Sequence, residues 1–367
     1  MTLIPITATP SGLTLACGMT GARGMTGARG MTGARGMTGP GAQDSAPEPV
    51  IARALQDLPA HAPVLVMIHG KGYSPADPAH DPHALIFAPR AGHGRSRFVS
   101  WPRRLGFALP GPRQPLGLCI ALGWDASGSI WTATRSADDT ALKLARLIQA
   151  IRRADPGRRI DLIGHSLGAR VILGAVPMLA AGSLGRILLL AGADFLHRAA
   201  AAQASYAGQT CEFFNITTRE NDLYDFLFER ALAPLGGQRA LGHGLGNGLG
   251  HGLGHGLGHG LGHGLGKGQA TAGGDNWLDI QLDHPGTAQA LRGLGLPLAP
   301  PRARICHWSV YLRPGVFRVY RALIHDRQRT EMARLRRALD APAHPRWSRI
   351  APALARQAGP ATPPSLC

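Results

Sequence analysis

The chain has 367 residues, of which 44% are hydrophobic and 17% charged, so it can build a sizeable core and is neither a coiled coil nor an extended polar chain. Its formal net charge is +17, yet only Lys71, Lys143 and Lys267 are lysines among 39 basic residues. This arginine bias, with abundant Ala, Gly and Pro, is typical of a GC-rich coding background, so the charge is weak evidence for a nucleic-acid partner.

The cysteines and the apolar runs indicate the compartment. Five scattered cysteines, an odd number without a Cys-x-x-Cys pair, argue against a disulfide framework. No uncharged apolar run reaches the roughly 18 residues that a membrane-spanning helix needs. The first 17 residues carry no Lys or Arg, which a secretory signal would have. We therefore expect a cytoplasmic protein without a transmembrane segment.

Two low-complexity tracts interrupt the chain. Residues 19–36 repeat Met-Thr-Gly-Ala-Arg-Gly, and residues 241–266 iterate Gly-His-Gly-Leu. Glycine at every second position makes the second tract costly to order, and a flexible tract fixes no ligand geometry, so we expect no metal site at its histidines. The predicted organisation is a disordered N-terminal segment over 1–47, a main domain over 48–340 with a flexible insertion at 234–275, and a Pro/Ala-rich tail over 341–367.

The remaining sequence alternates strand-like and helix-like segments. Apolar runs predict buried strands at 64–69, 116–122, 159–164, 186–191 and 211–216, and a short one at 304–306. Helical spacing predicts helices at 137–153, 167–181 and 315–338. Strands alternating with helices indicate an α/β fold with a mainly parallel sheet flanked by helices. Residues 73–115 are rich in Pro and Arg and are a candidate cap over a site.

One motif carries chemistry. Gly164-His165-Ser166-Leu167-Gly168 matches Gly-x-Ser-x-Gly and lies between a predicted strand and a predicted helix. A sharp turn there lifts the Ser166 hydroxyl out of the sheet, and the amide of Leu167 at the helix N-terminus can donate to an oxyanion. The sequence here resembles the α/β-hydrolase superfamily, lipase- and esterase-like members in particular.

The resemblance implies further site residues. A strand followed by His69-Gly70-Lys71-Gly72 is similar to the family's second oxyanion element, which makes the amide of Lys71 the other donor. The family order of serine, acid and histidine implies an acid after the strand at 211–216. Asp222 is the preferred acid; Glu220 is the runner-up and Asp225 the third candidate.

The base is sought among the histidines outside the repeat. The resemblance implies a histidine in a loop before the last helix, which favours His307, with His284 and His325 as alternatives. Removing residues 234–275 shortens the stretch between Asp222 and His307 to an ordinary gap. His165 precedes the nucleophile, and its ring is expected to point away from Ser166.

These residues predict a serine hydrolase that cleaves carboxylic esters through an acyl-enzyme intermediate, without metal or organic cofactor. Its substrate would be a small or lipid-like ester, with no nucleic-acid partner. An acyltransferase or thioesterase could use the same triad. A non-enzymatic alternative is a polyanion- or membrane-surface-binding protein that uses the arginines of the predicted C-terminal helix. Those arginines are Arg327, Arg329, Arg334, Arg336 and Arg337.

Overall fold

A single mixed sheet organises the molecule. The computed structural model describes residues 3–16, 46–90, 98–108, 116–245, 274–340 and 343–350. Its strands are β1 (Leu3–Thr9), β2 (Gly12–Leu15), β3 (Val64–Ile68), β4 (Leu118–Trp124), β5 (Ile160–His165), β6 (Arg186–Leu190), β7 (Glu212–Thr217) and β8 (Trp277–Gln281). They are ordered β2-β1-β4-β3-β5-β6-β7-β8. The β1–β2 pair is antiparallel and all the other pairs are parallel, which confirms the predicted mainly parallel sheet.

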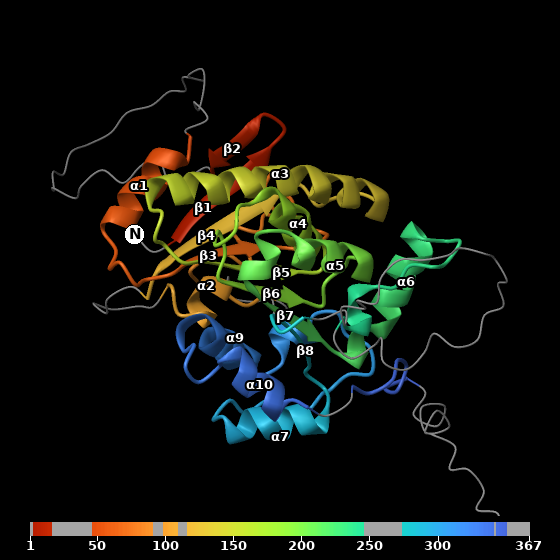
Figure 1. Cartoon of the computed structure of the whole chain (residues 1–367). Helices are drawn as coiled ribbons and strands as arrows, with labels where there is room; N and C mark the ends of the chain where they lie inside the picture. Colours follow the sequence, from red (N-terminus) through yellow and green to blue (C-terminus); the bar gives the residue numbers. More distant parts are fainter. Residues whose placement is uncertain are drawn as a thin grey trace, which may run out of the picture.

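Helices cover both faces of this sheet (Figure 1). One face carries α1 (Glu48–Gln56), α3 (Ile130–Ala154), α4 (Leu167–Ala175) and α5 (Leu196–Ala204). The other carries α2 (Trp101–Arg104), α7 (Pro285–Gly293), α8 (Ser309–Leu312), α9 (Val316–His325) and α10 (Met332–Ala338). The helix α6 (Asp222–Leu232) follows β7. We find no helix among the described residues with the length and apolar character that a membrane crossing requires.

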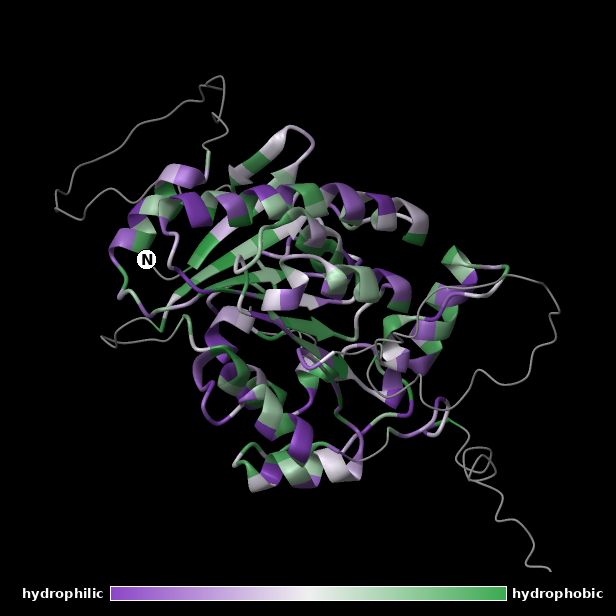
Figure 2. Ribbon diagram, viewed as in Figure 1, coloured by the Kyte–Doolittle hydropathy of each residue, from purple (hydrophilic) through white to green (hydrophobic). Residues whose placement is uncertain are grey.

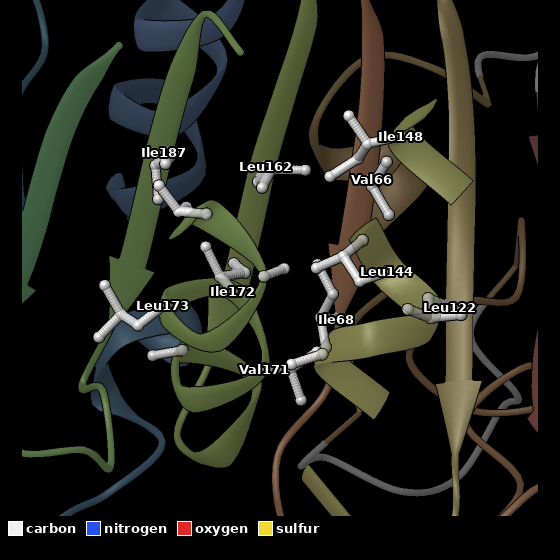
Figure 3. Close-up of a cluster of buried hydrophobic side chains, with 14 of the residues drawn as sticks. Val66, Ile68, Leu122, Leu144, Ile148, Leu162, Val171, Ile172, Leu173 and Ile187 are labelled. Carbon is white, nitrogen blue, oxygen red and sulfur yellow. The ribbon is translucent and has the colours of Figure 1, made fainter. Parts of the chain in front are cut away.

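Side-chain alternation along the strands produces two cores. On β3, Val66 and Ile68 face the first helical layer, whereas Leu65 and Met67 face the second. The strands are accordingly hydrophobic on both faces, and the outer helices mix hydrophobic and hydrophilic residues (Figure 2). In the first core, strand residues meet α3 and α4 (Figure 3). The labelled side chains are Val66, Ile68, Leu122, Leu144, Ile148, Leu162, Val171, Ile172, Leu173 and Ile187.

The N-terminal boundary predicted from the sequence was wrong. Residues 3–15, assigned to a disordered segment, form β1 and β2, and β1 pairs in parallel with β4 from Leu3↔Cys119 to Ala8↔Trp124. Ile4 and Ile6 are fully buried, and burial of this alternating apolar face anchors the strand. The sheet of the main domain therefore includes the N-terminal hairpin, which lies before the predicted boundary at residue 48. The repeat at 19–36 lies outside the described residues.

The predicted insertion at 234–275 and the Pro/Ala-rich tail are also partly packed. In the insertion, Leu241 and Leu245 are buried, the amide nitrogen of Asn215 donates to the Leu241 carbonyl, and β8 begins at Trp277, directly after the insertion. In the C-terminal tail, the Trp347 amide donates to Asp222. Burial of two leucines packs the start of the insertion, whereas a hydrogen bond to Asp222 holds Trp347 of the tail. Residues 246–273 and 351–367 lie outside the described part of the chain.

The C-terminal half differs from its predicted elements in two ways. The segment 304–306 is not a strand, and the helix predicted at 315–338 is divided into α9 and α10. Thr330 marks the division, since its hydroxyl donates to the Asp326 carbonyl and accepts from Arg186. Three of the arginines proposed for polyanion binding make ion pairs within the chain: Arg327 with Glu212, Arg329 with Asp326, and Arg336 with Asp275.

Candidate active site

Ser166 lies on a strained turn between β5 and α4. Its φ of 53° and ψ of −122° are rare for a residue with a side chain, and such strain is characteristic of functional sites. The turn is held by the Ser166 amide, which donates to Leu190, and by the Ser166 carbonyl, which accepts from Ala193 at 2.9 Å. The sharp strand-to-helix turn predicted from the motif is therefore present.

The motif's two glycines allow the turn to pack tightly. A Cβ on Gly164 would lie 2.7 Å from the Gly168 carbonyl oxygen, and a Cβ on Gly168 would lie 2.6 Å from the Ile68 carbonyl oxygen. Both obstacles are backbone atoms, which cannot swing aside as a side chain can. Glycine at both positions thus lets α4 start directly over β5 and β3.

The loop after β3 presses against the serine. A Cβ on Gly70 would lie 2.6 Å from the Ser166 Cβ, so only glycine fits there, and the next residue, Lys71, lines the same cavity as Ser166. His69 fixes the start of this loop, because its Nε2 accepts from the Trp124 amide at 3.1 Å. Burial lowers the pKa of His69 to about 3, so its ring is a neutral structural group.

His307 reaches the cavity from the loop that precedes α8. Its Nδ1 lies 2.6 Å from Oδ1 of Asn221, and its ring stacks on Tyr224 with a centroid distance of 4.8 Å. The centroid of the His165 ring lies 4.6 Å from that of His307, and His165 also lines the cavity. Burial lowers the pKa of His307 to about 4, which leaves the imidazole neutral at neutral pH.

Asn221 is the residue that the sequence analysis missed. It ends the short 3₁₀ turn η3 (Arg219–Asn221) that follows β7, and its Nδ2 donates to Asp225 Oδ1 at 2.9 Å. The side-chain amide of Asn221 thus has its Nδ2 toward Asp225 and its Oδ1 toward His307. The signal available in the sequence was position alone: Asn221 stands between the two favoured acids.

Asp222, the predicted acid, does not contact His307. Its Oδ2 accepts from the Trp347 amide at 2.7 Å, and its Oδ1 lies 3.2 Å from the Arg219 guanidinium. Successive residues of a helical turn point about 100° apart, so when Asn221 faces the cavity its neighbour faces elsewhere. The assignment of Asp222 as the partner of the base is corrected accordingly.

Glu220, the runner-up, anchors the histidine loop. Its buried carboxylate pairs with Arg313, and its backbone carbonyl accepts from the Cys306 amide at 2.8 Å. These contacts join the loop after β7 to the loop before α8 and bring His307 beside Asn221. Asp225, the third candidate, contacts Asn221 and not the imidazole.

The two alternative candidates for the base have other structural roles. His284 caps the N-terminus of α7, where its Nδ1 accepts from the Gly286 amide at 3.1 Å. His325 ends α9 and contacts the Leu105 carbonyl through Nε2. Neither lines the cavity that holds Ser166. The described residues contain no group of three or more His, Cys, Asp and Glu side chains that could hold a metal ion.

The cavity beside Ser166 has a volume of about 510 Å³. Its polar lining residues include Ser166, His307, Asn221, Asp225 and Lys71. The rest of the wall is mainly apolar and comprises Tyr73, Ile130, Ala193, Tyr224, Leu227, Phe228, Ala231 and Trp308. A mainly apolar cavity lined also by a few polar groups is the usual form of a small-molecule site.

The mainly parallel sheet flanked by helices and the strained serine between a strand and a helix are consistent with the α/β-hydrolase fold. Residues 52–210 match the family model described as alpha/beta hydrolase of unknown function (DUF900). The matched region contains the loop after β3 and the whole Ser166 turn. No curated protein matches the chain.

Solved structures give weaker likenesses. A Lactobacillus plantarum protein described as a cell surface hydrolase is 14% identical over 45% of this chain and 70% of its own, with a TM-score of 0.27. The phospholipase PlaB of Legionella pneumophila is 16% identical over 46% and 40%, with a TM-score of 0.25. A Trichoderma reesei cutinase is 15% identical over 40% and 64%, with a TM-score of 0.20. At these scores we draw nothing from them about activity.

Proposed function

We propose that this chain is a serine hydrolase that cleaves carboxylic esters with an apolar acyl group. The observation that carries the proposal is the convergence of Ser166, His307 and Asn221 on one cavity, with Asn221 Oδ1 2.6 Å from His307 Nδ1. A strained serine, a neutral imidazole and a fixed acceptor behind that imidazole are the parts that nucleophilic acyl transfer needs.

In the proposed reaction, Ser166 Oγ attacks the acyl carbon while its proton passes to Nε2 of His307. The resulting oxyanion accepts hydrogen bonds from the amides of Leu167 and Lys71. The tetrahedral intermediate expels the alcohol, which takes the proton back from His307, and leaves an acyl group on Ser166. Water, activated by the same imidazole, then releases the acid and restores the serine.

Asn221 determines which nitrogen of His307 acts as the base. Because its Oδ1 can only accept, Nδ1 of His307 must carry the ring proton, and Nε2 keeps the lone pair that Ser166 needs. An amide oxygen bears no full charge, however, so Asn221 stabilises the imidazolium less than a carboxylate in the same place would.

The shape of the cavity supports an apolar acyl group. Aromatic and aliphatic side chains form much of its lining, among them Tyr224, Phe228 and Trp308. An acyl chain that leaves water for this wall gains about 0.8 kcal/mol for each buried methylene. We therefore expect kcat/KM to rise with acyl length until the cavity is filled.

A fluorophosphonate probe tests the proposal, because it reacts only with an activated serine. We expect a single adduct on Ser166 in the folded protein and none in Ser166→Ala. Hydrolysis of p-nitrophenyl esters of graded acyl length provides the substrate test. A folded protein that gives no adduct, or an adduct on another serine, would contradict the serine-hydrolase proposal.

A further inference from the structure

Asp225 lies behind the proposed catalytic residues. It belongs to the first turn of α6, is 4% exposed, and accepts a hydrogen bond from Nδ2 of Asn221 at 2.9 Å. On its other side the carboxylate packs against Gly242, where an added Cβ would collide with Oδ2. A buried acid thus stands in line with Asn221 and His307, and the mechanism given above does not use it.

We propose that Asp225 is a positioning residue whose carboxylate sets the orientation of the Asn221 amide and, through it, the tautomer of His307. The proposal rests on the hydrolase function proposed above. The site is then a chain of four groups, Ser166, His307, Asn221 and Asp225. The negative charge of Asp225 does not contact His307 directly, because the side-chain amide of Asn221 lies between them.

The inference follows from donor and acceptor chemistry. An ionised Asp225 accepts only, so Nδ2 of Asn221 faces it and Oδ1 faces His307. A protonated Asp225 can donate, and the amide can then invert and present Nδ2 to His307. In that arrangement Nδ1 must accept, so the ring proton moves to Nε2, and the base that Ser166 needs is lost.

The surroundings of Asp225 place its protonation near neutral pH. Burial raises the pKa of Asp225 to about 7, whereas burial lowers that of His307 to about 4. The charged groups that act on Asp225 from neighbouring elements are Arg219 of η3, Asp222 and Glu229 of α6, and Arg346 of the C-terminal segment. The two arginines favour its ionised form and the two carboxylates oppose it.

The sign of the pH dependence is therefore fixed. Asp225 is ionised above about pH 7, so kcat is full there and falls as the pH drops through the pKa of Asp225. If protonation of His307 alone set the acid limb, kcat would hold down to about pH 4. Because protonation of Asp225 leaves the apolar lining of the cavity unchanged, KM should change little across this range.

The experiment measures kcat and KM on one activated ester from pH 5 to 9 for the full chain and for Asp225→Asn. For the wild type we expect kcat to fall about tenfold per pH unit below pH 7. The amide introduced by Asp225→Asn can offer either of its ends to Asn221 and does not titrate. The variant should therefore lose about 10- to 100-fold in kcat at pH 8 and show no inflection near pH 7.

Asp222→Asn is the matched control, since it removes a neighbouring carboxylate that does not face Asn221. It should keep the wild-type kcat at pH 8 and retain an acid limb. Because the charge of Asp222 opposes ionisation of Asp225, we expect that limb to move slightly toward lower pH and not to disappear.

A carboxylate exchange separates positioning from simple packing. The double variant Asn221→Asp/Asp225→Asn exchanges the two side-chain types. The carboxylate at position 221 then accepts directly from His307, and the amide at position 225 donates a hydrogen bond to that carboxylate. We expect this double variant to regain at least tenfold of the kcat lost in Asp225→Asn and to remain active at pH 5.5. A purely structural role for Asp225 would not produce such a rescue.

Two results would overturn the inference. One is an Asp225→Asn variant with wild-type kcat and an unchanged acid limb; the other is an Asp222→Asn control that abolishes the limb as Asp225→Asn does. Failure of the hydrolase proposal looks different, because the wild type would then be inactive and Ser166 would not be labelled. An active wild type that needs Ser166 and His307 but not Asp225 would refute this inference alone.

Discussion

The turn at Ser166 and the loop after β7 both bring a side chain to the same cavity, but different kinds of contact fix the conformations of the two segments. The turn depends on close backbone approaches at Gly164, Gly168 and Gly70, where no other residue fits. In the loop, Glu220, Asn221 and Asp222 point to three different partners, 93, 86 and 125 residues away along the chain. Local steric constraints thus set the position of Ser166, the proposed nucleophile, and distant packing decides which residue of the loop contacts His307, the proposed base.

The largest effect is expected from a substitution that separates the Ser166 turn from the loop after β7. His307→Ala should reduce kcat by about 10⁴-fold, because an unassisted serine hydroxyl is a poor nucleophile. The turn itself should stay intact, so far-ultraviolet circular dichroism should change little. Full activity in the folded variant would remove His307 from the mechanism.

The next effect tests whether distant packing holds the loop after β7. Arg313→Leu leaves the buried carboxylate of Glu220 without its partner, and we expect a loss of about 3–5 kcal/mol in the free energy of unfolding measured by urea. Arg329→Leu is the control. It breaks a half-exposed pair with Asp326 and should cost at most about 1 kcal/mol. Equal losses in the two variants would mean that the Glu220 contact is not special.

The smallest effect sharpens the choice among the three neighbours. Asn221→Ala removes the acceptor of the His307 ring proton and should lower kcat by about 100-fold. Asp222→Asn keeps the shape of a side chain that faces Trp347, and its kcat at pH 8 should stay within about threefold of wild type, the ordinary scatter for a side chain outside the site. Steady-state kinetics on one ester, with both variants checked for folding, decide the order. A larger loss in Asp222→Asn would restore Asp222 as the acid.

The sequence predicts the parts of the molecule that depend on local pattern. The apolar runs of β3 to β7 and the glycine pattern around Ser166 are each visible within a short window, so the parallel sheet is predictable. The strand β1 was missed because the adjacent repeat dominates the composition, and β8 because Asp279 and Gln281 interrupt its apolar character. Asn221 could not be chosen over Asp222 from sequence, since the choice depends on the rotation of a helical turn fixed by Arg313 and Trp347.

The pairing of Glu220 with Arg313 also affects the order in which the candidate site forms during protein synthesis. A ribosome releases the N-terminal part of a chain first, and β1 to β6, with the Ser166 turn, precede His307 by a long stretch of chain that includes β7, α6 and β8. Until Arg313 reaches Glu220, the loop that carries His307 lacks this anchor on the sheet. A nascent chain would therefore expose Ser166 before His307 is anchored, and the proposed acyl-enzyme chemistry would have to wait until Arg313 has been synthesised and paired.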